Sequence, residues 1–262
     1  MHNMMKKCVL FLMIIVIAGL YGRCWADPWK NTNSTHFIIY YKNAPDDFVN
    51  EVMDKSEGYY DKIADDLGFR RFDFWLWDNR AKIFIYDNSQ DYQQATGQPS
   101  WSSGCAYPKQ KIIHTFPYAK KFFDTILPHE MGHIIFREFV GFDNSAIPVW
   151  LDEGVACYAQ PSQFSQANEI IKEGMQNNRF ISLKGLSKLE PQSMVDPYLV
   201  SLFYAESVSI VDYLVKKSGQ DTFILFCQLL RDKKDLEKAL SSSYNFSGIS
   251  ELDQEWQRHL SK

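Results

Sequence analysis

Residues 129–133 of this 262-residue chain have the sequence HEMGH, and the interpretation of the whole chain starts from this pentapeptide. In a helix, His129 and His133 face the same way, because four residues make slightly more than one turn. Both imidazoles can then reach one Zn²⁺ at roughly 2.0–2.1 Å. Glu130 lies about 100° further round the helix, where its carboxylate can border the open side of the metal. The pentapeptide therefore predicts a zinc site with a base beside it.

The sequence on both sides of the pentapeptide predicts a helix. Apolar residues recur at helical spacing, and Gly141 can end the helix. Thr125 is the predicted N-cap, which places Pro128 in the first turn, where its missing N–H costs nothing. We therefore expect the pentapeptide near the start of one helix.

A third ligand is available downstream. Glu153 lies in a segment that predicts a new helix from Pro148 to near Pro161, and residues 141–147 form a short connection, so the two helices can pack as neighbours. Asp152 is the competing carboxylate. Two histidines and one carboxylate leave a metal position for water, which is the pattern of catalytic zinc sites rather than structural ones.

This ligand set indicates hydrolysis. A zinc-bound water has its pKa lowered to ~7, and Glu130 is the predicted base that takes its proton and returns it to a leaving amine. Peptide-bond cleavage is the expected reaction. Two other functions stay open: a zinc-stabilised binding or scaffold module that cleaves nothing, and a zinc hydrolase acting on another amide or ester. A pure scaffold would have no need for Glu130.

The HEMGH pentapeptide followed by Trp150-Leu151-x-Glu153-Gly154 resembles the gluzincin zinc peptidases, the clan of thermolysin and aminopeptidase N. Within that clan the chain most resembles the small bacterial peptidase-MA-like domains. Four further segments fall in a similar order, at residues 35–40, 81–86, 101–104 and 204–207. The resemblance selects Glu153 over Asp152 as the third zinc ligand.

A different zinc-peptidase family is excluded by inspection. Metzincins need Gly at position 136 and His at position 139, and this chain has Phe136 and Phe139.

The resemblance also points to an oxyanion stabiliser. Tyr204 and Tyr213 bracket a helix whose tyrosine spacing resembles the aminopeptidase-N-like segment that carries such a residue. A phenol O–H near the developing alkoxide can be worth ~3 kcal/mol. A core tyrosine without a catalytic role is the alternative, because the chain has 14 tyrosines, and Tyr198 is the second candidate.

The N-terminus has the pattern of an export signal. Lys6 and Lys7 precede an apolar run over residues 8–20, which suits a signal peptide and is short for a membrane span. Small residues at Cys24 and Ala26 predict cleavage after Ala26. Residues 1–26 are thus the predicted signal peptide and residues 27–262 the peptidase-MA-like domain, periplasmic or secreted. An uncleaved leader would instead remain as an anchor.

The net charge of the mature chain limits the partners that it can bind. The leader holds three of the 28 basic residues and none of the 32 acidic ones, which leaves a formal charge of −7 on the mature chain. That balance argues against nucleic acid or an anionic membrane as a partner, and leaves a peptide or protein substrate.

Cys105, Cys157 and Cys227 allow one disulfide with one thiol left over. The sequence does not fix an oligomeric state.

The order of elements predicts an α+β fold with the active-site cleft between two halves. The N-terminal half is strand-rich and leads into the zinc helix, with strands expected at 37–41, 81–86 and 111–116 and helices at 48–67 and 91–96. The C-terminal half is helical, with helices expected at 163–176, 202–217, 221–231, 234–242 and 250–260. Residues 111–116 are either an edge strand on which substrate backbone pairs or a buried structural strand. His114 on that strand could touch substrate.

Residues 104–111 bear on whether the protein would cleave a peptide internally or remove residues from its N-terminus. Aminopeptidases of the resembling clan hold the substrate's free amine with a carboxylate in a strand ahead of the metal helix. The corresponding stretch, residues 104–111, has no acidic residue and contains Lys109 and Lys111, which would repel an ammonium group. We therefore expect internal cleavage, although Glu206 or Asp152 could supply the missing charge from another direction.

Overall fold

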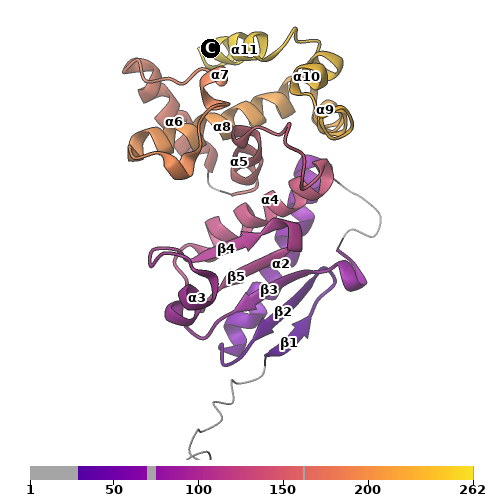
Figure 1. Ribbon diagram of the computed structural model, residues 1–262, viewed down its shortest axis with the longest axis vertical. Helices are drawn as coiled ribbons and strands as arrows, with labels where there is room; N and C mark the ends of the chain where they lie inside the picture. Colours follow the sequence, from indigo (N-terminus) through magenta and orange to yellow (C-terminus); the bar gives the residue numbers. More distant parts are fainter. Residues whose placement is uncertain (1–28, 70–74, 162, 262) are drawn as a thin grey trace, which may run out of the picture. The chain divides into compact units, whose positions relative to one another are not determined.

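The computed structural model of the protein describes residues 29–69, 75–161 and 163–261, and nearly all of them belong to one compact unit, Asn31–Lys262. The predicted signal peptide lies outside the described residues. Within them, a mixed five-stranded sheet occupies the N-terminal half, and ten helices lie mostly in the C-terminal half (Figure 1). The α+β prediction is confirmed.

The sheet has the order β1-β2-β3-β5-β4. β2 and β3 pair in parallel, as do β3 and β5, whereas β4 runs antiparallel to β5. The strand bounds are Lys30–Asn33 for β1, Phe37–Tyr41 for β2, Ala81–Ile85 for β3, Gly104–Tyr107 for β4 and Ile112–Thr115 for β5. β2, β3 and β5 are therefore internal strands, and β1 and β4 are the two edges.

This order decides between the two alternatives for residues 111–116 in favour of an internal structural strand. The strand expected at 111–116 is β5, and it lies between β3 and β4, so it is not an edge. The reason is a tight reversal that the sequence did not reveal: residues 108–110 form a 3₁₀ turn, and Lys111 takes a left-handed backbone with φ 54°. The reversal folds β4 back over the open side of β5. The exposed edge beside the metal helix is thus β4.

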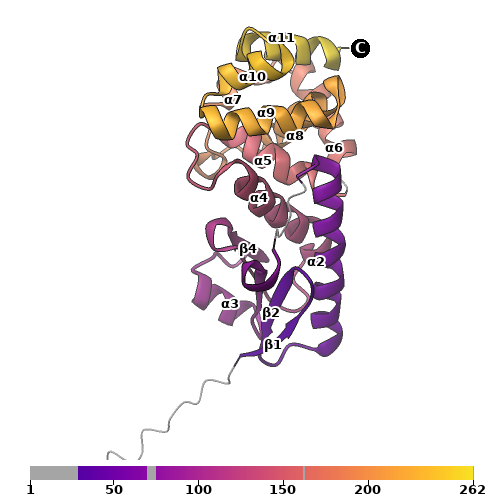
Figure 2. The same cartoon turned by 90° about the vertical axis from the view of Figure 1, so that its right-hand side faces the viewer.

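Helices cover both faces of the sheet. α2 (Asp46–Leu67) packs against β2 on one face, and α3 (Ser89–Thr96) contacts β5 on the other (Figure 2). α2 buries apolar side chains at helical spacing and ends at Gly68, whose φ of 68° suits the left-handed cap that glycine adopts without strain. The sequence placed this helix and its glycine stop correctly.

The C-terminal half is built around one long apolar helix, α8 (Pro197–Ser218), which packs against α5, α6 and α9. By length and composition α8 could cross a membrane, but 61 % of its apolar window is buried inside the protein, as expected of a central core helix. The other helices of this half are α5 (Val149–Tyr158), α6 (Gln163–Gln176), α7 (Leu183–Leu186), α9 (Gln220–Lys233), α10 (Leu236–Tyr244) and α11 (Ile249–Leu260).

α4 (Leu127–Val140) joins the two halves. It contacts α2 and β4 on the sheet side and α5 and α9 on the helical side (Figure 1). One continuous apolar core runs through it, from Ile83 in the sheet through Phe136 of α4 to Phe203 and Trp256 in the helices. The HEMGH segment therefore lies at the junction of the two halves.

Candidate metal centre

The helix that carries the histidines begins differently from the prediction. A π-helical turn, Phe122–Ile126, runs directly into α4, and no side chain caps the start of the helix, so Thr125 is not the N-cap. Because Ile126 already has helical backbone angles, Thr125 faces no free N–H to cap. Pro128 does lie in the first turn, and the helix does end at Gly141, as predicted.

His129 and His133 point to the same side of α4. Their Nε2 atoms lie 3.2 Å apart, and their rings meet edge to face with centroids 4.7 Å apart. Both side chains are largely buried. The predicted i, i+4 juxtaposition is present in the structure.

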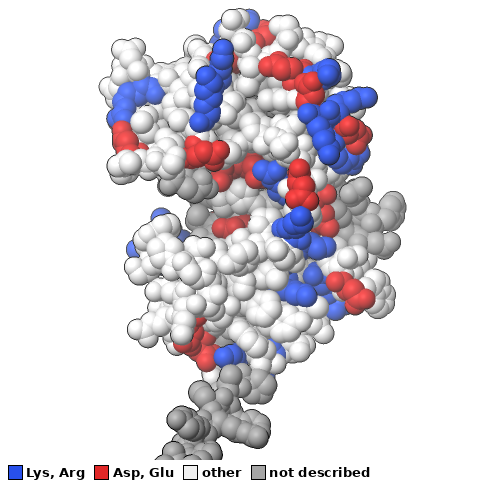
Figure 3. All heavy atoms as spheres, viewed as in Figure 1, with Lys and Arg blue, Asp and Glu red and all other residues white. Residues whose placement is uncertain are grey.

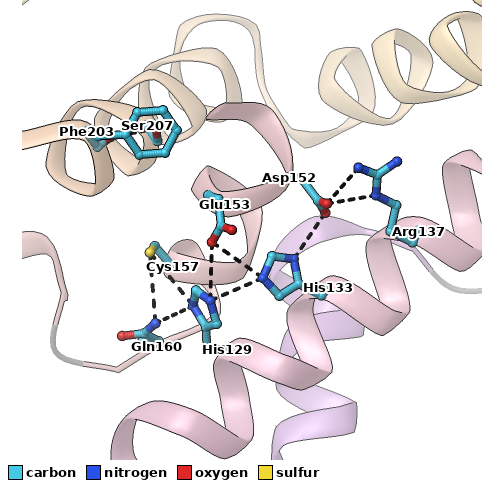
Figure 4. Close-up of polar contacts among 9 residues, drawn as sticks. All are labelled: His129, His133, Arg137, Asp152, Glu153, Cys157, Gln160, Phe203 and Ser207. Carbon is cyan, nitrogen blue, oxygen red and sulfur yellow. Dashed lines mark hydrogen bonds and ion pairs between the residues drawn. The ribbon is translucent and has the colours of Figure 1, made fainter. Parts of the chain in front are cut away.

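Glu153 approaches the same point from α5, as Figure 4 shows. Its Oε2 lies 3.4 Å from Nε2 of His129 and 3.5 Å from Nε2 of His133. Gly132 permits this approach, because a Cβ built there would lie only 2.9 Å from the Cα of Ala156. The two helices therefore pack in close contact, and their contact sets the position of Glu153.

The three donor atoms fit a tetrahedral metal ion. Ligands bound to zinc at 2.0–2.1 Å in tetrahedral geometry lie ~3.3 Å from one another, and the three distances here are 3.2, 3.4 and 3.5 Å. Oε2 of Glu153 is buried and has no hydrogen-bond partner among the described residues. A buried unpaired carboxylate oxygen is costly unless it coordinates a metal or accepts a proton. The cluster therefore fits a zinc site.

Asp152 lies behind His133 rather than at the ligand position. Its Oδ1 is 3.2 Å from Nδ1 of His133, and its Oδ2 accepts a hydrogen bond of 2.8 Å from Nε of Arg137 (Figure 4). Burial alone would raise the pKa of Asp152, but the hydrogen bond and charge of His133, with those of Arg137, hold it below its usual value. The carboxylate is thus ionised and can accept the Nδ1 proton of His133, which leaves Nε2 free for a metal.

The protonation states of His133 and Glu153 follow from the same contacts. Burial alone would lower the pKa of His133, but Asp152 and Glu153 raise it well above its ordinary range. Burial alone would raise the pKa of Glu153, but its contacts with His129 and His133 lower it to about 2. The carboxylates are therefore ionised, and without a metal His133 holds a proton.

His129 has a different partner. Nδ1 lies 2.7 Å from the side-chain amide nitrogen of Gln160 and 3.9 Å from Sγ of Cys157. When Nε2 binds a metal, Nδ1 carries the proton, so the amide must present its oxygen to accept it. Rotation of the amide by 180° brings the oxygen to this position. Burial raises the pKa of the Cys157 thiol, with a contribution from the charge of Glu153, so this cysteine stays protonated.

Glu130 opens onto a cavity of about 540 Å³ beside the metal cluster, the name used here for the three side chains of His129, His133 and Glu153. β4 and the loop before it supply one wall through residues 101–104, and α4 and the segment before it supply another. His129, Cys157 and Gln160 reach the same cavity. Glu130 is the only carboxylate among its described lining residues. A substrate in this cavity would meet His129 of the predicted ligand set and Glu130 together.

Tyr204 also lines this cavity, from α8. Burial, with smaller contributions from the charges of Glu153, Cys157 and Glu130, raises the pKa of its phenol, so the O–H stays protonated. Gly154 lets α8 approach, because a Cβ there would lie 2.5 Å from the carbonyl oxygen of Ser207. Tyr198 does not line the cavity; its ring lies under Arg179. The structure thus places Tyr204, and not Tyr198, beside the metal cluster.

Several secondary expectations need correction. Lys109 pairs with Asp143 at 2.9 Å and Lys111 with Glu138 at 3.1 Å, so neither lysine faces the cavity. The positive charges at the cavity are those of Lys120 and Lys121, which the sequence analysis overlooked.

Two further candidates lie away from the cavity. Glu206 is fully buried and accepts a 3.0 Å hydrogen bond from the backbone N–H of Ile181, so it cannot bind a substrate amine. His114 contacts the hydroxyl of Tyr86 and stacks on Phe84, and burial lowers its pKa to about 4. Neither residue lines the cavity.

Gln160 and Cys157 were also missed by the sequence analysis. Cys157 and Gln160 follow Glu153 by four and seven residues, about one and two helical turns, so α5 and the residues just after it carry all three on one side. That spacing is the signal that could have found them. The disulfide that the sequence allowed is not formed among the described residues: Cys105, Cys157 and Cys227 are all free.

His129 and His133, one helical turn apart, and Glu153 from the next helix form a cluster that could hold a metal ion, with the donor set that metal-dependent hydrolases use. Comparison with known protein families places this geometry in context: residues 76–262 match the peptidase MA superfamily, and the chain belongs to that superfamily. Peptidases of this superfamily are typically metal-dependent. The match includes α4, α5 and α8 and begins after β2 and α2. No curated protein matches the chain.

Proposed function

We propose that this protein is an exported, zinc-dependent metallopeptidase of the gluzincin type that cleaves peptide bonds within chains. His129, His133 and Glu153 would hold the zinc. The observation that carries the proposal is the mutual spacing of their donor atoms, 3.2–3.5 Å, next to a cavity lined by Glu130. Zinc bound there would supply Lewis acidity that activates water and polarises a carbonyl.

The protein's own residues would move the protons. Glu130 takes the proton of the attacking water and returns it to the leaving amine, which is general base and then general acid catalysis by one carboxylate. The phenol O–H of Tyr204, kept protonated by its buried position, donates a hydrogen bond to the oxyanion that forms at the attacked carbonyl. Asp152 and Gln160 hold the imidazoles in the required tautomer.

The proposal of internal cleavage rests on the absence of a carboxylate that could bind the free amine of a substrate among the described residues that line the cavity. Apart from Glu130, no carboxylate among the described residues lines it. Asp152 is engaged by His133 and Arg137, and Glu206 is buried elsewhere, so the two carboxylates that could have bound a free amine are occupied or remote. The outer edge of β4 borders the cavity and offers backbone groups for an extended substrate segment that continues in both directions.

Export is part of the proposal. The basic, apolar and small-residue pattern of residues 1–26 supports secretion or periplasmic location, with a peptide or protein as the partner and with no nucleic acid. Protein made in a secretion-competent bacterium should have the mass of a chain that starts at Asp27. A full-length chain retained in the membrane fraction would instead support an uncleaved anchor.

The decisive test is the Glu130→Gln variant, which keeps the shape of the side chain and removes the proton acceptor. Zinc content by elemental analysis should stay at one per chain, while kcat on a peptide library should fall roughly 10²–10⁴-fold. The His129→Ala, His133→Ala and Glu153→Ala variants should lose zinc. A zinc-loaded wild-type protein that cleaves no peptide would support the scaffold function, and one that cleaves only esters or non-peptide amides would support the other hydrolase.

A further inference from the structure

The cavity beside the metal centre has a basic rim that the proposed mechanism does not use. Lys120 and Lys121 both line the cavity, and both side chains are exposed. Neither forms an ion pair with any residue in the parts of the chain that the structure describes. Figure 3 shows the hollow between the sheet side and the helical side of this face, with acidic atoms inside it.

Neighbouring lysines behave differently. Lys109 and Lys111, on the reversal after β4, are neutralised by Asp143 and Glu138. In this part of the molecule the protein therefore pairs the lysines that point away from the cavity and leaves unpaired the two that line it. An anion that enters the cavity would find these two charges available.

The backbone holds the two lysines in place. Tyr118 and Lys121 both have left-handed backbones with φ of 59°, which is uncommon for residues other than glycine. The π-helical turn Phe122–Ile126 follows directly. Unusual backbone of this kind persists where the surrounding structure requires it and is concentrated at functional sites. Here it turns the chain so that the lysines meet the cavity before α4 begins.

We propose that Lys120 and Lys121 bind a carboxylate of the substrate, so that the enzyme prefers peptides with an acidic group within a few residues of the cleaved bond. A lysine ammonium on a flexible stem suits a carboxylate that arrives in more than one pose. The exposed indole of Trp101, on the same cavity, offers an apolar surface for the stem of the bound residue. This inference rests on the proposed peptidase function.

The test compares peptides that differ in one charge. A set of N-acetylated, C-amidated peptides carries one Glu at each of three positions on either side of the cleaved bond, and a matched set carries Gln instead. Wild-type kcat/KM should be about tenfold higher for Glu at one or two of these positions, and the ratio should shrink as salt is raised. A third set, with Gln inside and a free C-terminal carboxylate, shows whether the bound carboxylate is a side chain or a chain end.

The variants locate the preference. The Lys120→Gln, Lys121→Gln double variant should bring the Glu/Gln ratio close to one, and the Lys120→Glu, Lys121→Glu variant should favour peptides with Lys instead. The matched control is Lys233→Gln, Lys234→Gln: these lysines are also adjacent and exposed, and Lys234 also has a left-handed backbone, with φ 51°. The control should keep the wild-type ratio. A ratio that survives in the Lys120, Lys121 variant would overturn the inference, as would an active enzyme with no preference.

Binding separates this inference from the proposed function. Zinc-loaded Glu130→Gln protein should bind the fluorescently labelled Glu peptide about tenfold more tightly than the Gln peptide by anisotropy, and the lysine substitutions should remove the difference. If the wild type cleaves nothing but this difference is present, the peptidase proposal fails and the carboxylate site stands. Equal binding of both peptides would show that the lysines do not recognise a carboxylate.

Discussion

The two histidines of the metal cluster are held by unlike groups. His133 has the ionised carboxylate of Asp152, which is itself held by Arg137, whereas His129 has the neutral amide of Gln160. A carboxylate makes an imidazole a stronger metal ligand than an amide does, because it stabilises positive charge on the ring. The structure thus predicts that His133 contributes more to zinc affinity than His129 does.

Gln160→Leu should weaken zinc binding about tenfold, because the Nδ1 proton of His129 loses its acceptor and the ring loses its orientation. Gln160→Glu supplies an ionised acceptor and should match or exceed the wild-type affinity. Competition with a chromophoric chelator measures both, and Gln176→Leu, on an exposed site of α6, is the control. Unchanged affinity in Gln160→Leu would show that the amide does not hold His129.

Glu206 ties folding stability to pH. Burial raises its pKa to about 8, and the charge of Asp253 adds to the shift, whereas the Ile181 N–H opposes it. An unfolded glutamate has a pKa of about 4.3. Between these two values the folded chain binds a proton that the unfolded chain has released. The free energy of unfolding should therefore fall as pH rises through this window, by up to about 1.4 kcal/mol per pH unit.

Glu206→Gln should remove this dependence, because the amide cannot ionise and its oxygen can still accept from Ile181. Urea unfolding at pH 5.5 and pH 8, with zinc present throughout, measures the loss of stability in each protein. The wild type should lose a few kcal/mol more than the variant. Since both proteins share all other titrating groups, an equal loss in the two would rule out a protonated Glu206 in the folded state.

The sequence predicted some site residues and missed others for identifiable reasons. Helical spacing alone places His129 and His133 on one face, and the structure has them there. Tyr204 and Tyr198 lie on different faces of one helix, so spacing shows that only one can reach the cavity but not which one. The partner of His129 is Gln160, a residue type with no metal-site signature of its own. Only its place seven residues after Glu153 could have marked it, and its contact with His129 depends on the packing of α5 against α4.

At the scale of helices, two glycines allow the helices of the candidate site to pack closely together. Gly132 lets α5 approach α4, and Gly154 lets α8 approach α5, in both cases because a side chain would meet backbone atoms of the neighbouring helix. The first contact positions Glu153 and the second positions Tyr204. Close helix approach is therefore the structural condition for the metal cluster and for the phenol beside it.

Gly132→Ala should separate α4 from α5 and lower both stability and zinc affinity. A Cβ there lies 2.9 Å from the Cα of Ala156, so backbone must shift, and overpacking of this kind typically costs about 1–3 kcal/mol. Thermal unfolding with and without zinc measures both effects. Gly58→Ala is the control: it lies within α2 with nothing within 4 Å of an added Cβ, and it should be neutral or stabilising. Wild-type zinc affinity in Gly132→Ala would contradict this role of the contact.

Strand order was beyond the reach of local sequence. β2, β3 and β5 are rich in β-branched and aromatic residues and predict strands, but nothing in them states which strands are neighbours. β4 has the sequence GCAY, too short and too small to predict a strand. Its identity as the edge follows from the reversal at Lys111, where a lysine takes a backbone conformation usually reserved for glycine.

At the scale of the whole molecule, the predicted α+β class and the family are confirmed, and the order of elements explains why. The predicted strands all precede the pentapeptide and most of the predicted helices follow it, so the sequence predicts a strand-rich half and a helical half. What the sequence could not show is that α4 packs against both halves, through one continuous core. That arrangement depends on contacts between residues far apart in the chain.

Zinc removal should lower the melting temperature of the whole protein, because the metal would link α4 to α5 at the junction of the halves. Free zinc at 100 times Kd adds about 2.7 kcal/mol, which corresponds to roughly 5–10 °C for a domain of this size. Calorimetry in zinc and in chelator measures the shift. The Glu153→Ala variant should show little of it. An equal shift in that variant would mean that the stabilising metal binds elsewhere.

The sequence positions of the proposed ligands also bear on the stage of folding at which the proposed peptidase would become active. The three proposed ligands lie within residues 129–153, on two helices joined by a short loop, whereas Tyr204 belongs to a helix some 50 residues further on. Contacts between near neighbours in sequence form early in folding, and distant ones form later. Under the proposed function, a newly made chain would thus capture its metal before Tyr204 docks beside it. Such an order would delay full activity until folding is nearly finished, and so limit self-digestion among unfolded copies.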